Sequence, residues 1–118
     1  MSSEGLHEPR ETLPAKLLEM HRAIASLIEE LEAVDWYAQR VAASGDEALR
    51  EVLSHNRDEE KEHACMTLEW IRRNDPQFDA LLRRILFQDG PIVAGEHSTP
   101  DGETPTLEIG SLRPRGSV

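Results

Sequence analysis

The chain has 118 residues, a formal net charge of -10, 31% charged residues and 4% aromatic residues. This length allows one domain, and the acidity excludes the basic surface that nucleic-acid binding needs. One cysteine excludes an intrachain disulfide, and no apolar run reaches the roughly 20 residues that cross a membrane. With no secretory signal in residues 1–11, we expect a cytoplasmic protein. The acidity has two interpretations: it attracts cations, or it only keeps the chain soluble.

The first predicted helix follows a polar segment, residues 1–12, which we expect to be a flexible arm. Helical periodicity begins at Pro14 and ends at Ser44-Gly45, which predicts a helix over about 14–43. Its apolar positions form two stripes. The first consists of Leu17, Ile24, Ile28 and Leu31, and the second of Leu27, Glu30, Val34, Tyr37 and Val41.

A second and a third helix follow. Asp46 is a good N-cap for a helix that ends near Asn74, and the short connection predicts an antiparallel hairpin. Asp75 and Pro76 begin a shorter helix with apolar residues up to Phe87. The fold class is therefore all-α, with a helical region over 13–90, a disordered linker over 91–106 and a tail over 107–118.

The two stripes of the first helix predict self-association. One partner helix can cover only one stripe, and the third helix is too short to cover the other. A hairpin of this size also has a weak core of its own. A dimer of hairpins would complete a four-helix bundle, so we expect a homo-oligomer.

The second helix contains a candidate metal site. Glu60 and His63 are three residues apart and therefore share a helix face. Glu30, about as far before the turn as Glu60 is after it, is expected at the same level. Two hairpins would supply six carboxylate and imidazole ligands, which suits a pair of iron or manganese ions. The alternative is a solvated salt bridge, because Glu-x-x-His also arises by chance. The stripe of the second helix expected to face inward is Leu49, Leu53, Asn56, Glu60, His63, Thr67 and Trp70.

Neighbouring residues allow two interpretations each. Glu29 and Glu32 are expected on an outer acidic face, either as plain surface carboxylates or as guides for Fe²⁺. Trp36 is an interface or half-exposed aromatic residue, and Tyr37 is a packing residue or a hydrogen-bond donor near the metal. Cys65 is expected to be a small core residue.

Long segments resemble the encapsulated ferritin family. They are residues 29–37 (EELEAVDWY), 55–63 (HNRDEEKEH) and 66–70 (MTLEW), within a match over roughly 20–93. The resemblance implies a ferroxidase with half a ferritin bundle per chain, a di-iron centre shared across a dimer interface, and a ring-like decamer. It also implies iron ligation by Glu30, Glu60 and His63, a site for metal entry at Glu29 and Glu32, and Trp36 and Tyr37 close to the centre.

The tail resembles the cargo-loading peptide of encapsulin nanocompartments. The resemblance lies in Leu107, Ile109, Gly110, Ser111 and Leu112, whereas Glu108 is less typical there. It implies that an encapsulin shell protein is a partner and that the chain works inside the shell, where the iron mineral is stored. The alternatives are a non-catalytic metal-binding protein and a structural helical oligomer, each recruited through the tail.

Overall fold

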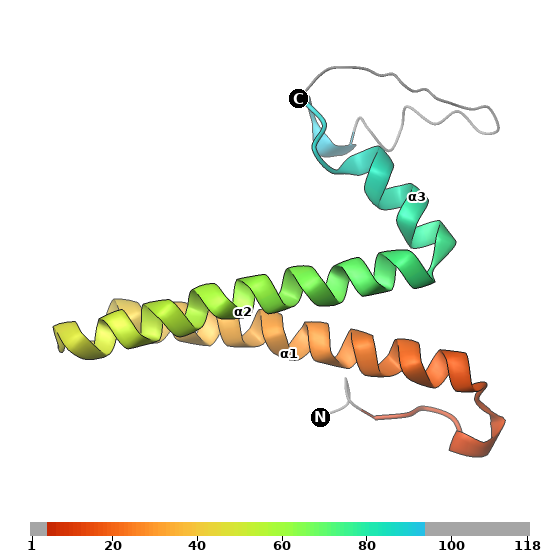
Figure 1. Ribbon diagram of the computed structural model, residues 1–118, viewed down its shortest axis with the longest axis horizontal. Helices are drawn as coiled ribbons and strands as arrows, with labels where there is room; N and C mark the ends of the chain where they lie inside the picture. The colour runs from red at the N-terminus through yellow and green to blue at the C-terminus, as the bar shows by residue number, and fades with distance from the viewer. Residues whose placement is uncertain (1–4, 94–118) are drawn as a thin grey trace. The chain divides into compact units, whose positions relative to one another are not determined.

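The computed structural model describes residues 5–93, and within this range the chain is all-helical (Figure 1). The elements are a 3-10 helix η2 (Arg10–Thr12) and three α-helices, α1 (Ala15–Ala43), α2 (Glu47–Asn74) and α3 (Pro76–Ile85). The predicted fold class of two long helices and a short third one is confirmed. No described helix is long and apolar enough to span a membrane.

Helices α1 and α2 form the predicted antiparallel hairpin, packed side by side along their lengths (Figure 1). Residues 44–46 connect them. The Ser44 hydroxyl accepts a hydrogen bond from the Asp46 backbone N–H at 3.2 Å, and Asp46 Oδ1 accepts one from the Leu49 N–H, also at 3.2 Å. Asp46 is therefore the N-cap of α2, as the sequence predicted.

Helix α3 lies in a separate unit that begins at Asp75. Asp75 Oδ1 accepts a hydrogen bond from the Phe78 N–H at 2.9 Å, and Pro76 occupies the first helical position, so the predicted start is confirmed. The helix ends at Ile85, two residues earlier than expected. Phe87 has a φ of 60°, which is uncommon for a residue with a side chain and incompatible with a continuing α-helix.

The hairpin has a small core of its own. Among the described residues only Ala64 and Ile71 are buried, and both belong to α2. Large apolar side chains remain exposed on both helices. On α1 these are Leu17, Ile24 and Leu31, spaced by seven residues, and Trp36. The first predicted stripe of α1 is thus largely uncovered in a single chain, whereas the members of the second stripe are all half-buried.

Candidate metal centre

Glu60 and His63 lie together on α2, as their spacing predicted. Nδ1 of His63 is 3.5 Å from Oε1 of Glu60. The Glu60 side chain is 26% exposed and that of His63 46% exposed. The pair therefore offers a carboxylate and an imidazole, adjacent to each other and reachable from outside the hairpin.

Helix α2 is rotated relative to the sequence prediction. The buried residues of α2 are Ala64 and Ile71, which the expected inward stripe omitted. Leu49, His63 and Trp70, which were expected to face inward, are exposed. The reason is that α2 has apolar residues over a wide arc, and the small Ala64 and the well-packed Ile71 decide which part of the arc meets α1.

The uncovered part of this arc surrounds His63. We call it the exposed apolar stripe of α2, and its large members are Leu49, Val52, Met66 and Trp70, 40–58% exposed. His63 lies between Val52 and Met66 along this stripe. Successive positions along this stripe are three, eleven, three and four residues apart, and at about 100° per residue all of them lie on one side of the helix. Any helix that covers the stripe would also cover His63.

Glu30 reaches α2 from the facing helix. The Thr67 hydroxyl donates a hydrogen bond to Glu30 Oε2, with 3.3 Å between the oxygens. The other oxygen, Oε1, is buried and has no hydrogen-bond partner among the described residues. A carboxylate oxygen without a partner in a buried position is costly, and a cation would satisfy it. The donor set therefore fits a metal ion at Glu30.

The hydrogen bond of Glu30 to α2 is with Thr67 and not with Glu60, the residue expected at the same level. Thr67, the partner of Glu30, is seven residues beyond Glu60, about 10 Å along the helix axis. Helical side chains lean towards the N-terminus of their own helix. In an antiparallel hairpin Glu30 therefore leans away from the turn, and Glu60 leans towards it.

The described part of a single chain does not contain a complete ligand set. Within residues 5–93, no three His, Cys, Asp or Glu side chains are close enough to hold a metal ion together. The candidate ligands occur instead as two groups, the Glu60–His63 pair and Glu30 with its partnerless oxygen.

The remaining residues singled out from the sequence lie outside these two groups. Glu29 and Glu32 are exposed, as an outer acidic face requires, and Trp36 is 50% exposed. Tyr37 is half-buried, and the Arg40 guanidinium lies 5.4 Å from the centroid of its ring. A second histidine on α2, His55, contacts Glu59 at 3.0 Å. The tail residues 107–112 lie outside the described part of the chain.

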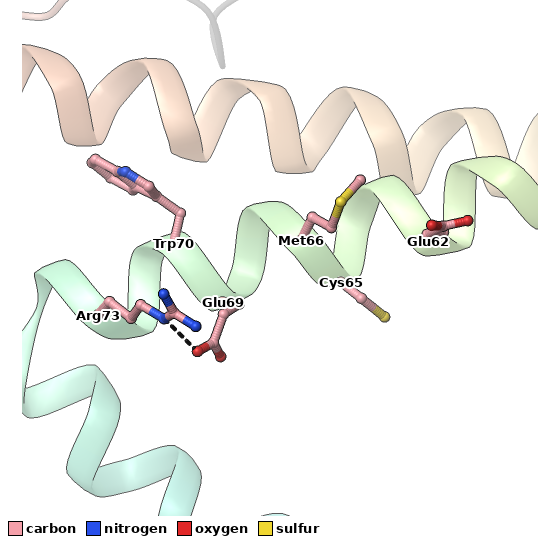
Figure 2. A pocket seen from close by; sticks show the side chains of 6 residues that line it. All are labelled: Glu62, Cys65, Met66, Glu69, Trp70 and Arg73. Atoms are coloured by element: carbon pink, nitrogen blue, oxygen red, sulfur yellow. Dashed lines mark hydrogen bonds and ion pairs between the residues drawn. The ribbon is translucent and has the colours of Figure 1, made fainter.

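A shallow groove runs along α2 beyond the ligand pair (Figure 2). All six lining residues come from α2: Glu62, Cys65, Met66, Glu69, Trp70 and Arg73. Cys65 is exposed there, so its expected place in the core is wrong. The groove contains none of the candidate ligands, and a surface formed by one helix cannot enclose a small molecule.

Glu69, at the edge of this groove, carries the electrostatic feature that sequence reasoning missed. It accepts hydrogen bonds from Arg72 at 2.9 and 2.7 Å and from Arg73 at 2.7 Å. These bonds, those of Arg72 first, lower the pKa of Glu69 from 4.5 to about 2. The spacings of three and four residues are the available sequence signal. Thr67 was likewise predicted to face inward but given no role.

Comparison with known proteins gives consistent matches. A family model described as EncFtn-like matches residues 5–89. The chain is 58% identical to the "Encapsulated ferritin-like protein" of Rhodospirillum rubrum over 102 residues, which are 86% of this chain and 73% of that protein. It is 52% identical to the "Ferritin-like protein" of Thermotoga maritima, covering 88% of this chain and 91% of that protein.

Two further matches extend this set. The "Encapsulin nanocompartment cargo protein EncC" of Myxococcus xanthus is 42% identical over 111 residues, covering 80% of this chain and 85% of that protein. The crystal structure of protein ne0167 from Nitrosomonas europaea superposes with a TM-score of 0.72 at 59% identity, over 75% of this chain and 97% of that one.

Proposed function

We propose that this chain, which belongs to the EncFtn-like family, is a ferroxidase that oxidises Fe²⁺ to Fe³⁺ with dioxygen at a di-iron centre shared by two copies. The observation that carries the proposal is the position of His63. It lies beside Glu60 and in the middle of the exposed apolar stripe of α2. A second chain that covers this stripe would bring its own carboxylates to the Glu60–His63 pair.

The two-fold dimer supplies what one chain lacks. Each copy would contribute Glu30, Glu60 and His63, so that two iron ions share four carboxylates and two imidazoles. The seven-residue spacing of Leu17, Ile24 and Leu31 gives α1 a matching uncovered stripe. Burial of both stripes would form a four-helix bundle and exclude water from the ligands. A ring-like decamer built from such dimers is part of the proposal.

Iron is the substrate in this reaction, and the chain's residues bind and orient it. The carboxylates of Glu30 and Glu60 favour Fe³⁺ over Fe²⁺ because they add negative charge, and dioxygen accepts the electrons. Neutral His63 donates a nitrogen ligand. The exposed Glu29 and Glu32 attract Fe²⁺ to the site, and Trp36 and Tyr37 lie close to the assembled centre.

We propose that the chain acts inside an encapsulin shell. Two relatives carry the words "encapsulated" and "encapsulin nanocompartment cargo protein" in their names. The tail motif at Leu107, Ile109, Gly110, Ser111 and Leu112 would bind the shell protein, since spaced apolar side chains can fill pockets on a partner. Iron oxidised by the chain would then be stored as mineral in the shell.

The second candidate function is a metal-binding or structural oligomer without turnover. The uncovered apolar stripes favour it, because a scaffold needs them as much as an enzyme does. Oxygen consumption with Fe²⁺ separates the two, since a scaffold consumes none above the background.

The test is an anaerobic Fe²⁺ titration followed by air, with ferric absorbance and oxygen consumption recorded for the wild type, His63→Ala and His55→Ala. His55 is the matched control, an exposed histidine on the same helix. We expect oxidation that saturates near one iron per chain, about two per dimer, in the wild type and the control, and none above background in His63→Ala. Equal background rates in all three proteins would refute the ferroxidase.

A further inference from the structure

The two oxygens of the Glu30 carboxylate have different surroundings. Oε2 accepts a hydrogen bond from the Thr67 hydroxyl at 3.3 Å, across the α1–α2 interface. Oε1 is buried and has no partner among the described residues. This division orients the plane of the carboxylate, since a partial rotation about its last bond would break the hydrogen bond to Thr67.

The hydrogen bond is longer than usual for two oxygens, which prefer about 2.7–2.8 Å. It therefore directs Oε2 towards Thr67 without fully satisfying the charge of the group. The negative charge remains available at Oε1. A metal ligand held in this way loses less rotational freedom on binding than a freely rotating one.

We propose that Thr67 is a positioning residue for iron binding: its hydroxyl holds Oε2 of Glu30 so that Oε1 is left to bind the cation. The inference rests on the proposed ferroxidase site and deepens it, because it adds a residue that supports a ligand without touching the metal. Partners of this kind affect metal affinity about 10–100-fold when removed.

Simple packing is the competing role for Thr67. It is half-buried, between Ala64 and Ile71 on the face of α2 that meets α1. Thr67→Val has nearly the same shape and removes only the hydroxyl, whereas Thr67→Ser keeps the hydroxyl and removes a methyl group. If Thr67 only packs, Thr67→Ser should weaken metal binding more than Thr67→Val does. If Thr67 positions Glu30, Thr67→Val should weaken metal binding more.

The experiment titrates the full-length proteins anaerobically with Co²⁺ and follows its visible absorption, which reports the ligands around the ion. We expect the Co²⁺ dissociation constant to rise about 10–100-fold in Thr67→Val and to stay within about threefold of the wild type in Thr67→Ser. Circular dichroism confirms that each variant is helical, and Thr67→Ala serves as a second variant without the hydroxyl.

The outcomes separate this inference from the proposed function. Wild-type Co²⁺ affinity in both Thr67→Val and Thr67→Ala would overturn the role of Thr67 and leave the proposed ferroxidase intact. An equal loss of Co²⁺ affinity in Thr67→Val and Thr67→Ser would have the same meaning. A loss of Co²⁺ affinity in Thr67→Val and Thr67→Ala alone, together with background Fe²⁺ oxidation by the wild type, would support the positioning role of Thr67 and refute the ferroxidase. A wild type that binds no Co²⁺ overturns the inference.

Discussion

Nδ1 of His63 lies 3.5 Å from Oε1 of Glu60, and the pair lies where two faces of α2 meet. Glu60 is the less exposed of the two and borders the face that packs against α1, whereas His63 belongs to the exposed apolar stripe. A metal ion bound by both residues would therefore lie at the edge of the hairpin. In the proposed centre, the ligands of a second chain would therefore complete the site.

The first prediction concerns Glu60. We expect Glu60→Ala to lower the rate of Fe²⁺ oxidation at limiting iron by about tenfold or more, because the iron ion loses the carboxylate ligand that lies beside His63. Glu51→Ala is the control, since Glu51 is an exposed glutamate of α2 outside both ligand groups. Stopped-flow absorbance measures both rates. Equal rates in the two variants would exclude Glu60 as a ligand.

The pH dependence of Glu69 is the second prediction. Hydrogen bonds from Arg72, and then Arg73, hold its pKa at about 2 instead of 4.5. Because the pKa of Glu69 is lower in the folded chain, its ion pairs with Arg72 and Arg73 stabilise the fold above about pH 4.5. This stabilisation is lost as the pH falls towards about 2. The Glu69 side chain is 41% exposed, so solvent screens these ion pairs and the contribution is small.

Carbon-detected NMR of the Glu69 carboxyl group measures its pKa directly. We expect a titration midpoint of about 2 in the wild type. The midpoint should rise in both Arg72→Gln and Arg73→Gln, and more in the first, because Arg72 donates two of the hydrogen bonds. A midpoint unchanged by either substitution would contradict the assignment.

Local signals in the sequence predicted the helices well. Asp46, Asp75 and Pro76 set helix starts through contacts within three residues, so their effect can be read without knowledge of the fold. Glu60 and His63 were predicted together for the same reason, since a helix alone fixes their spacing.

The rotation and level of α2 against α1 could not be read in the same way. They depend on how Ala64 and Ile71 pack across the hairpin, and several apolar residues of α2 competed for that face. The sequence therefore placed Cys65 in the core, whereas Cys65 is exposed, and it gave no role to Thr67, which contacts Glu30.

The third prediction concerns the uncovered stripe of α1. Leu31 is 54% exposed in the single chain. If a second chain buries it, Leu31→Gln removes about 1.5–3 kcal/mol of apolar burial per side chain. We expect the dimer dissociation constant to rise about tenfold or more.

Sedimentation velocity over a range of concentrations measures this constant. The control is Arg22→Gln, at an exposed position on another face of α1. Dissociation that is the same in both variants would place Leu31 outside the interface.

The fourth prediction is that Fe²⁺ stabilises the assembly. If the ligands come from two chains, as we propose, a metal ion binds the dimer and not the separate chains, and the free energy of metal binding is added to that of association. At a free Fe²⁺ concentration of about 100 times its dissociation constant, this adds about 2.7 kcal/mol. Chelation of the metal should therefore shift native mass towards smaller species, and Fe²⁺ added without oxygen should reverse the shift. Glu30→Ala should resemble the chelated protein at every iron concentration, whereas Glu51→Ala should respond as the wild type does. Native mass that is independent of Fe²⁺ would mean that the apolar stripes alone hold the chains together, with each metal ion bound within one chain or not at all.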